Sequence, residues 1–348
     1  MRSPPLDRGV WAALAAAALF GAGAPFAKLL LEGTGPWLLA AILYLGSGLG
    51  LALVRRVRRA APVHPTRAEW GWLAGATFAG GVLGPVLLMS GLAAMPAAGA
   101  SLLLNMEGVL TALIAWFVFR ENVDRRVALG MALIVGGAGV LSWPGEASVG
   151  LGWPALAVLG ACLAWAVDNN LTRKVSLTDA SFIAMVKGLT AGVTNLVIAI
   201  ALGATWPALP TVVAGALLGF VSYGASLVLF VVALRRLGTA RTGAYFSVAP
   251  FFGALLAVAL LGETVGPALL AAAALMALGV WLHLAERHEH EHAHEPVEHT
   301  HAHTHDAHHA HAHTGAAVGA EPHTHAHRHA PLRHRHPHYP DAHHGHTH

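Results

Sequence analysis

Charged residues are scarce in this 348-residue chain: Asp, Glu, Lys and Arg together make up 11% of it, whereas 55% of its residues are hydrophobic. A soluble domain of this length carries far more charge, so the composition excludes an ordinary soluble protein. Cysteine occurs once, as Cys162 within an apolar stretch, which excludes an intramolecular disulfide. The chain also lacks a P-loop, a Ser-His-Asp set and a dinucleotide-binding glycine pattern in a fitting context. We therefore expect no enzyme and no nucleic-acid partner.

Instead, the chain has a series of apolar stretches separated by short polar loops. About 20 helical residues are enough to cross the roughly 30 Å of hydrocarbon in a bilayer. The sequence therefore predicts an all-α integral membrane protein with ten transmembrane helices embedded in a lipid bilayer. The stretches lie near residues 10–31, 36–54, 70–92, 97–119, 126–142, 151–171, 180–202, 211–234, 239–261 and 265–284.

Lysine and arginine are distributed unevenly between the two sets of loops. If the N-terminus is cytoplasmic, all of the loops that carry Lys or Arg are cytoplasmic, and the opposite loops carry none. The positive-inside rule then predicts a multi-pass protein of the cell inner (plasma) membrane with both termini in the cytoplasm. The residues concerned are Arg55, Arg56, Arg58, Arg59, Arg67, Arg120, Arg125, Arg126, Arg173, Lys174, Arg235, Arg236 and Arg241.

One long segment occurs twice. Residues 91–121 align without a gap to residues 233–263 at a constant offset of 142, and each copy ends with a Glu after an apolar run. This predicts two five-helix repeats, over 1–142 and 143–285, followed by a polar tail over 286–348. Because five is an odd number, the second repeat enters the membrane from the opposite side, so the repeats are inverted, as in many secondary transporters.

The second copy carries a family resemblance. Its segment from Tyr223 to Glu263, YGASLVLFVVALRRLGTARTGAYFSVAPFFGALLAVALLGE, is similar to the EamA-type branch of the drug/metabolite transporter superfamily almost throughout. The first copy departs from this pattern, because Gly108 stands where the family has the helix proline that is retained as Pro250. The resemblance implies an EamA fold and a transport function. It does not imply a substrate, since the superfamily serves amino acids, sugars, nucleotides and drugs.

Two polar residues lie near the middle of the fourth apolar stretch, Asn105 and Glu107. A charge at the centre of a bilayer costs about 2.5 to 3.5 kcal/mol on insertion scales, so a carboxylate there requires an explanation. The sequence leaves two hypotheses open for Glu107: a proton carrier or cation ligand, and a structural carboxylate hydrogen-bonded between helices. Asn105 lies about 200° around the helix from Glu107, so only a wide cavity would contact both side chains.

A second polar group is expected near the cytoplasmic ends of the sixth and seventh stretches. An ion pair between Asp168 and Lys187 is geometrically plausible, either within a transport pathway or as a structural pair at the inner interface. Asn195 lies two further turns along the seventh stretch. The candidate pathway residues are Asn105, Glu107, Asp168, Asn169, Asn170, Lys187 and Asn195.

Three other charged residues are interpreted as structural. Glu121 and Glu263 close the matched helices and are expected to orient the loops that follow them. In the first stretch, Pro25 interrupts the backbone hydrogen bonds, and Lys28 is expected to pair with Glu32 one helical turn later.

From His283 onward the chain holds all of its 25 histidines except His64, and those after His283 lie in the tail. No hydrophobic periodicity accompanies them, so the tail is expected to be disordered and cytoplasmic. Neutral imidazoles bind Ni²⁺, Co²⁺, Zn²⁺ and Cu²⁺, and we expect the tail to bind such metals without their being a required cofactor. The candidate ligands are His288, His290, His292, His294, His299, His301, His303, His305, His308, His309, His311 and His313.

Three functions remain open from the sequence. The first is a secondary transporter that exports a small metabolite, with the tail as a metal buffer or sensor. In the second, the divalent metal is itself the cargo, and in the third the protein is a metal-responsive membrane sensor that transports nothing. Without an ATP-binding motif, transport draws on an ion or substrate gradient. The sequence leaves a monomer and a homodimer equally open.

Overall fold

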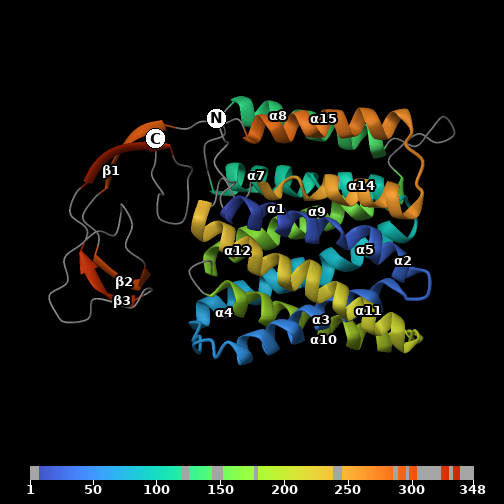
Figure 1. Cartoon of the computed structure of the whole chain (residues 1–348), viewed down its shortest axis with the longest axis horizontal. Helices are drawn as coiled ribbons and strands as arrows, with labels where there is room; N and C mark the ends of the chain where they lie inside the picture. The colour runs from blue at the N-terminus through green and yellow to red at the C-terminus, as the bar shows by residue number, and fades with distance from the viewer. Residues whose placement is uncertain are drawn as a thin grey trace. The chain divides into compact units, whose positions relative to one another are not determined.

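The computed structural model of the protein describes residues 8–119, 125–142, 152–175, 179–237 and 245–284, together with four short strands of the tail. The chain divides into two units, Met1–Glu286 with Asp341–His348, and Arg287–Pro340. The first unit is helical wherever the structure describes regular elements, and the strands belong to the second (Figure 1).

Among the residues that the structure describes, seven helices are long and apolar enough to cross a membrane, and shorter apolar helices occupy the other three predicted positions. The chain is therefore a multi-pass membrane protein, and the count of ten spans stays a prediction. The seven are Arg8–Leu31, Pro36–Val57, Arg67–Ala93, Ala97–Val118, Trp153–Thr172, Ala180–Ala201 and Leu209–Phe230, and the shorter ones are Ala128–Leu141, Ala249–Leu261 and Pro267–Leu282.

Several long helices consist of two or three segments. The first half contains α1 (Arg8–Gly21), α2 (Gly23–Leu31), α3 (Pro36–Val57), α4 (Arg67–Ala76), η1 (Thr77–Leu83), α5 (Gly84–Ala93), α6 (Ala97–Leu103), α7 (Met106–Phe119) and α8 (Arg125–Ser142). The second half contains α9 (Trp153–Thr172), η2 (Arg173–Val175), α10 (Ala180–Ala201), α11 (Leu209–Gly219), η3 (Phe220–Ala225), α12 (Ser226–Leu237), α14 (Ala249–Leu261) and α15 (Pro267–Leu284).

Local sequence signals explain where several helices begin and end. Thr66 and Glu69 form a capping box at the start of α4, since each side chain accepts a hydrogen bond from the backbone N–H of the other residue. Asp179 caps α10 by accepting the Phe182 backbone N–H. Gly262 ends α14 in the left-handed conformation with φ of 65°, which glycine adopts without a Cβ penalty.

One π-helical segment interrupts the third helix of each half. The first, η1, ends at Leu83 and the second, η3, ends at Ala225, which places their ends 142 positions apart (225 − 83), the same offset as the sequence repeat. A π-turn leaves backbone carbonyls without their usual helical partners, and such segments occur frequently at functional sites. In η1, Gly80 O and Gly81 O accept side-chain hydrogen bonds.

The fourth helix of each half is broken as well. Leu104 and Asn105 form a turn between α6 and α7, and Ser247 and Val248 form a turn before α14. When 142 is added to the residue numbers of the first turn, its position agrees with that of the second turn to within one residue. Counting from Ala97 at 1.5 Å a residue, the first break lies about 12 Å into the span, near the middle of a bilayer of roughly 30 Å.

Small residues let the helices approach closely. A Cβ on Gly188 of α10 would lie 2.7 Å from Gly48 Cα of α3, so glycine is required where these two helices cross. Likewise, a Cβ on Gly279 of α15 would lie 2.6 Å from Gly130 O of α8. The pair α8 and α15 runs side by side along one edge of the bundle, and α3 packs against α10 at the opposite edge (Figure 1).

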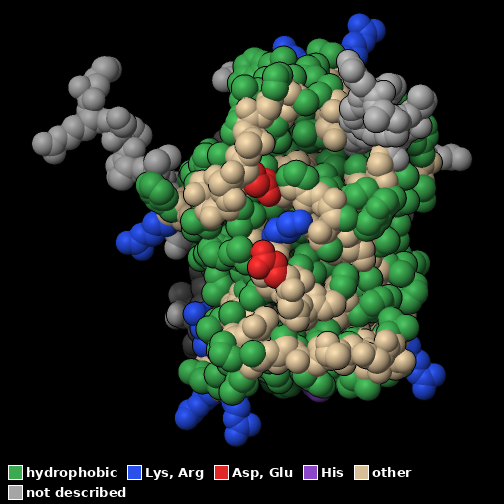
Figure 2. Space-filling view, turned by 90° about the vertical axis from the view of Figure 1, so that its right-hand side faces the viewer, with side chains coloured by type: hydrophobic (Ala, Val, Ile, Leu, Met, Phe, Trp, Pro, Cys, Tyr) green, Lys and Arg blue, Asp and Glu red, His purple; other side chains and the backbone are tan. Residues whose placement is uncertain are grey.

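Hydrophobic side chains cover most of the face drawn in Figure 2; acidic side chains with a basic side chain between them lie near its middle, whereas other basic side chains project from its margins. Large apolar side chains are exposed along many helices, among them Leu53, Phe117 and Val197 at 62%, 71% and 61%. In water this surface would be costly, whereas lipid tails are as apolar as these side chains. The exposed surface is therefore that of a membrane-embedded protein.

The tail contains four strands, β1 (Glu289–His294), β2 (Glu298–His303), β3 (His323–Arg328) and β4 (Leu332–Pro337). Antiparallel pairing joins β1 to β4 and β2 to β3, and histidines oppose one another in both registers, for example His292 with His334 and His301 with His325. The disorder expected of the tail stays a prediction. The strand pairing fits the sequence pattern, because alternation of His with other residues is also the period of a strand.

Candidate functional site

Glu107 occupies the first turn of α7, immediately after the helix break at Leu104 and Asn105. The side chain is half-buried, and its Oε1 accepts a hydrogen bond of 2.8 Å from Asn169 Nδ2 of α9. Asn169 also donates to Thr111 Oγ1, one turn along α7, at 3.4 Å. An acidic side chain in the first turn of a helix interacts favourably with the helix dipole. The ion pairs found among the described residues do not include Glu107.

The predicted ion pair between Asp168 and Lys187 is present. Lys187 Nζ lies 2.5 Å from Asp168 Oδ1 and 2.6 Å from Oδ2, so one ammonium group contacts both oxygens. Thr172 Oγ1 donates to Asp168 Oδ1 at 2.8 Å. The two charged side chains retain only 17% and 8% exposure, so the pair is largely shielded from water. Glu107 lies within electrostatic range of both members of the pair.

The carbonyl of Gly80 in η1 joins three elements. Tyr44 of α3 and Trp165 of α9 both donate to it at 2.8 Å. A Cβ on Gly80 would overlap Asp168 Oδ2, so only glycine leaves room for the carboxylate at this position. The π-turn therefore supplies an acceptor for Tyr44 and Trp165 and leaves space for the Asp168 carboxylate.

The other predicted pathway residues are used differently. Asn105 is buried and donates to Leu102 O at 3.0 Å, with Met276 Sδ of α15 at 3.8 Å, so the structure does not bring it to Glu107. Asn195 is fully buried and donates to Gly81 O at 2.9 Å, which fixes it to η1. Asn170 donates to Ala166 O at 2.8 Å and to Thr111 O at 3.4 Å. Of the seven candidates, Glu107, Asn169, Asp168 and Lys187 form the central group.

A series of aromatic rings, absent from the sequence prediction, lies beside this group. Tyr44 is within electrostatic range of Glu107 and Asp168, and its ring centroid lies 5.5 Å from that of Tyr223. Phe20 continues the series at 5.9 Å from Tyr223 and 5.4 Å from Phe246. Tyr223 belongs to η3, and Phe246 directly precedes the break before α14. A signal was available, because both tyrosines stand within apolar stretches.

At one end of the bundle, charged side chains hold the loop between α5 and α6. Lys28 Nζ donates to Leu92 O at 2.6 Å, Ala93 O at 3.2 Å and Met95 O at 3.0 Å, and so caps the end of α5. Glu263 accepts from Ala97 N at 2.6 Å and Ala98 N at 2.8 Å, and so caps the start of α6.

These contacts revise two interpretations of the sequence. Lys28 binds backbone carbonyls rather than Glu32, because three carbonyls at a helix end lie within reach of its ammonium group. Glu263 stabilises the start of a helix in the other half instead of its own following loop. The equivalent Glu121 lies outside the described residues. Pro25 is buried in α2, three residues after the irregular link at Ala22.

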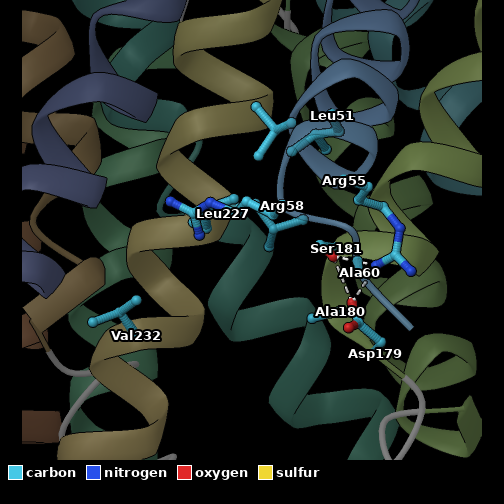
Figure 3. Close-up of a pocket in the computed structure, with 11 residues that line it drawn as sticks. Leu51, Arg55, Arg58, Ala60, Asp179, Ala180, Ser181, Leu227 and Val232 are labelled. Atoms are coloured by element: carbon cyan, nitrogen blue, oxygen red, sulfur yellow. Dashed lines mark hydrogen bonds and ion pairs between the residues drawn. The ribbon is translucent and has the colours of Figure 1, made fainter.

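At the opposite end, a pocket of about 210 Å³ lies between α3, α10 and α12 (Figure 3). Arg55 Nη1 crosses from α3 to Asp179 Oδ1 at 2.9 Å and to Ser181 Oγ at 2.5 Å. Burial raises the pKa of Asp179, but hydrogen bonds from Ser181 and Phe182 and the charge of Arg55 outweigh it, so this pKa lies below its ordinary value. Arg58 also lines the pocket, which does not include Glu107.

In the part of the chain that the structure describes, no group of three or more His, Cys, Asp or Glu side chains lies close enough together to hold a metal ion. Of the predicted tail ligands, six lie in strands: His290, His292, His294, His299, His301 and His303. The other six, His288, His305, His308, His309, His311 and His313, lie outside the described residues.

Comparison with known proteins gives a consistent result. A model described as the EamA-like transporter family matches the chain twice, over residues 7–143 and 152–285. An uncharacterized transporter of Methanothermobacter thermautotrophicus is 29% identical over 269 residues, which are 72% of this chain and 78% of that protein. A probable 4-amino-4-deoxy-L-arabinose-phosphoundecaprenol flippase subunit ArnE of Pseudomonas fluorescens is 40% identical over 76 residues, 22% of this chain and 64% of that protein.

A solved crystal structure of a protein resembles the fold. It superimposes with a TM-score of 0.61 and covers 78% of this chain and 95% of its own, at 19% sequence identity. At that identity the likeness concerns the fold alone.

Proposed function

The chain belongs to the EamA-like transporter family, and from this premise we propose that it is a secondary transporter that exports a small metabolite through a site centred on Glu107. One observation carries the proposal. An acidic side chain stands mid-span at a helix break, half-buried and hydrogen-bonded to Asn169 of the other half. Broken helices at the middle of the membrane form the binding sites of many secondary transporters.

The contacts between the two halves are compatible with movement of one half against the other. The bond between Glu107 and Asn169 joins α7 to α9 near the centre. Glu263 joins α14 to α6 at one end, and Arg55 joins α3 to α10 at the other. Alternating access requires contacts at each end that close while the other end opens. Each of these end contacts consists of a few hydrogen bonds at helix termini, which can form and break without unpacking the helices.

The matching positions of the two π-helices, the two helix breaks and the two family matches support an inverted pair of five-helix repeats. In this arrangement the end that carries Arg55 and Asp179 faces the cytoplasm, as the positive-inside rule predicts. Reporter fusions after Arg59, Arg126, Lys174 and Arg241 should all indicate the cytoplasm. A reporter signal from the outer side at any of these sites would contradict the ten-helix topology.

The tail is proposed as a metal buffer or sensor attached to the transporter. Its strands bring histidines into opposing positions, as at His299 with His327 and His303 with His323. Imidazole nitrogens on neighbouring residues suit Ni²⁺, Zn²⁺ and Cu²⁺. This observation also favours a second candidate function, in which the divalent metal is the cargo and the tail concentrates it.

The test is growth of a strain without the protein, measured across Ni, Co, Zn and Cu salts, amino acids and their analogues. Wild-type protein should restore tolerance to the cargo, and Glu107→Gln should not, although its volume and its hydrogen bond to Asn169 are retained. Glu32→Gln, an exposed carboxylate at a helix end, serves as the matched control. Restoration by Glu107→Gln at normal protein levels would assign Glu107 a structural role. Metal tolerance alone would favour the second candidate.

A further inference from the structure

We propose that the cargo is an organic monocation, such as an amine with an apolar or aromatic body, whose charged group pairs with Glu107. This inference rests on the proposed function and names the substrate class of the same site. It begins from the balance of charge. The described charges of the central group are Glu107, Asp168 and Lys187, and Lys187 contacts both oxygens of Asp168. One negative charge, on Glu107, therefore lacks a balancing cation among these residues.

Three other carboxylates described within or beside the spans each have a cation partner or two hydrogen-bond donors. Glu263 accepts two backbone N–H groups, Asp179 contacts Arg55, and Asp168 contacts Lys187. Within the described part of the chain, the Glu107 side chain receives one neutral hydrogen bond, from Asn169 to Oε1. A half-buried carboxylate with a single neutral donor gains most from a ligand that brings a positive charge.

The surroundings of Glu107 favour an organic cation over an inorganic one. Thr111 contributes a hydroxyl and a backbone carbonyl to the same neighbourhood, where they accept from Asn169 and Asn170. Both oxygens are of a kind that can accept a hydrogen bond from an ammonium group. Tyr44, within electrostatic range of Glu107, starts the aromatic series that continues through Tyr223 and Phe20. Aromatic faces attract ammonium groups and pack against apolar bodies. A hard metal ion would instead require several oxygen ligands.

The experiment measures binding to the purified full-length protein by titration calorimetry. Three probes share a phenyl ring and a similar length but differ in charge: 2-phenylethylammonium, 2-phenylethanol and 3-phenylpropionate. We expect saturable binding of the ammonium probe only. Glu107→Gln should weaken this binding about tenfold or more, because it removes the pairing charge. Glu32→Gln should leave the binding unchanged.

A second variant keeps the inference testable if Glu107→Gln does not fold. Asn169 is exposed, so Asn169→Asp can be accommodated and adds a second carboxylate beside Glu107. It should tighten binding of the ammonium probe. Tyr44→Leu should weaken binding of 2-phenylethylammonium more than binding of methylammonium, since only the first has a ring to pack.

Three results would overturn the inference: no saturable binding of the ammonium probe, equal binding of the neutral or anionic probe, or unchanged binding in both Glu107→Gln and Asn169→Asp. If the anionic probe binds and the growth assay still depends on Glu107, the proposed function stands and the substrate class is wrong. If the growth assay shows no transported compound but the ammonium probe binds at Glu107, the cation site stands and the transport function is wrong.

Discussion

Removing one member of the Asp168–Lys187 pair should destabilise the protein far more than removing both. Lys187→Met leaves the Asp168 carboxylate with a single hydrogen bond, from Thr172, in a position that is 8% exposed. Asp168→Asn leaves the Lys187 ammonium group without its partner. In the double variant neither charge remains, and Met and Asn fill similar volumes.

The magnitude follows from the burial. Breaking a buried ion pair by removing one partner costs about 3 to 5 kcal/mol, because an uncompensated charge is left behind. The side chains are 17% and 8% exposed, so we take the lower end, about 3 kcal/mol for each single variant. Replacing both members with neutral residues should cost about 1 kcal/mol or less. At roughly 2 °C per kcal/mol, the single variants should melt about 6 °C lower and the double variant about 2 °C lower.

Thermal unfolding of the purified protein in detergent, followed by tryptophan fluorescence, measures these shifts, with Glu32→Gln as an exposed control. Additive losses, in which the double variant falls by the sum of the two single variants, would refute the coupling. The same proteins separate the two interpretations of the pair. If the pair is structural, the double variant should recover transport together with stability. If Asp168 takes part in the pathway, stability should recover and transport should not.

Three further predictions concern a glycine, a surface ion pair and the tail. Gly80→Ala should lower the free energy of unfolding by about 1 to 3 kcal/mol and impair transport, because the new Cβ overlaps Asp168 Oδ2. As a control in the same melting assay, Gly136→Ala should be neutral or slightly stabilising, because no atom lies within 4 Å of the new Cβ. Asp179→Asn should lower the free energy of unfolding by about 1 kcal/mol or less, since this side chain is 40% exposed. The full loss should be measured above about pH 4, the ordinary carboxyl pKa, and it should disappear as the pH falls through the lowered pKa of Asp179. Metal binding by the tail should weaken between about pH 7 and pH 5.5, because imidazoles become protonated in this range. Truncation after Arg287 should abolish the response to metal while metabolite export continues. Unchanged metal tolerance and unchanged export after truncation, at low and at high metal concentration, would contradict both roles of the tail.

The helices were predictable because the physical requirement for them is local. A bilayer demands long apolar stretches whose backbone groups bond within the helix, and both features are written in consecutive residues. All ten predicted stretches contain described helix, and seven of them reach the length of a span. The helix segmentation was not predictable in the same way. The π-turns at Gly80 and Tyr223 depend on partners from other helices, as Tyr44 and Trp165 illustrate.

The candidate site was predicted in part, for a related reason. Ionisable residues in apolar stretches are rare enough to be recognised singly, so Glu107, Asp168 and Lys187 were identifiable. Their pairing followed from their depth in adjacent spans. Which polar residues turn toward the group depends on side-chain packing. Asn105 and Glu107 are two positions apart, yet Asn105 packs against α15 while Glu107 contacts α9.

Long-range capping could not be predicted at all. Lys28 and Glu263 are each compatible with a bond to a neighbour on their own helix, and the sequence gives no measure of the distance to α5 or α6. The structure places helix ends with unpaired backbone groups within their reach. An unpaired helix end is a strong competitor for a charged side chain, because it offers several aligned donors or acceptors at once.

Access to the site from both sides of the membrane tests the central claim most directly. In a Cys162→Ala background, Thr111→Cys places a nearly isosteric thiol one turn from Glu107, and Val193→Cys, 52% exposed midway along α10, is the lipid-facing control. Membrane-impermeant thiol reagents are applied to vesicles of each orientation. If the site at Glu107 opens alternately to each side, Thr111→Cys is labelled from either side and Val193→Cys from neither. Labelling of Thr111→Cys from one side only, whatever gradient is applied, would contradict alternating access to a site at Glu107.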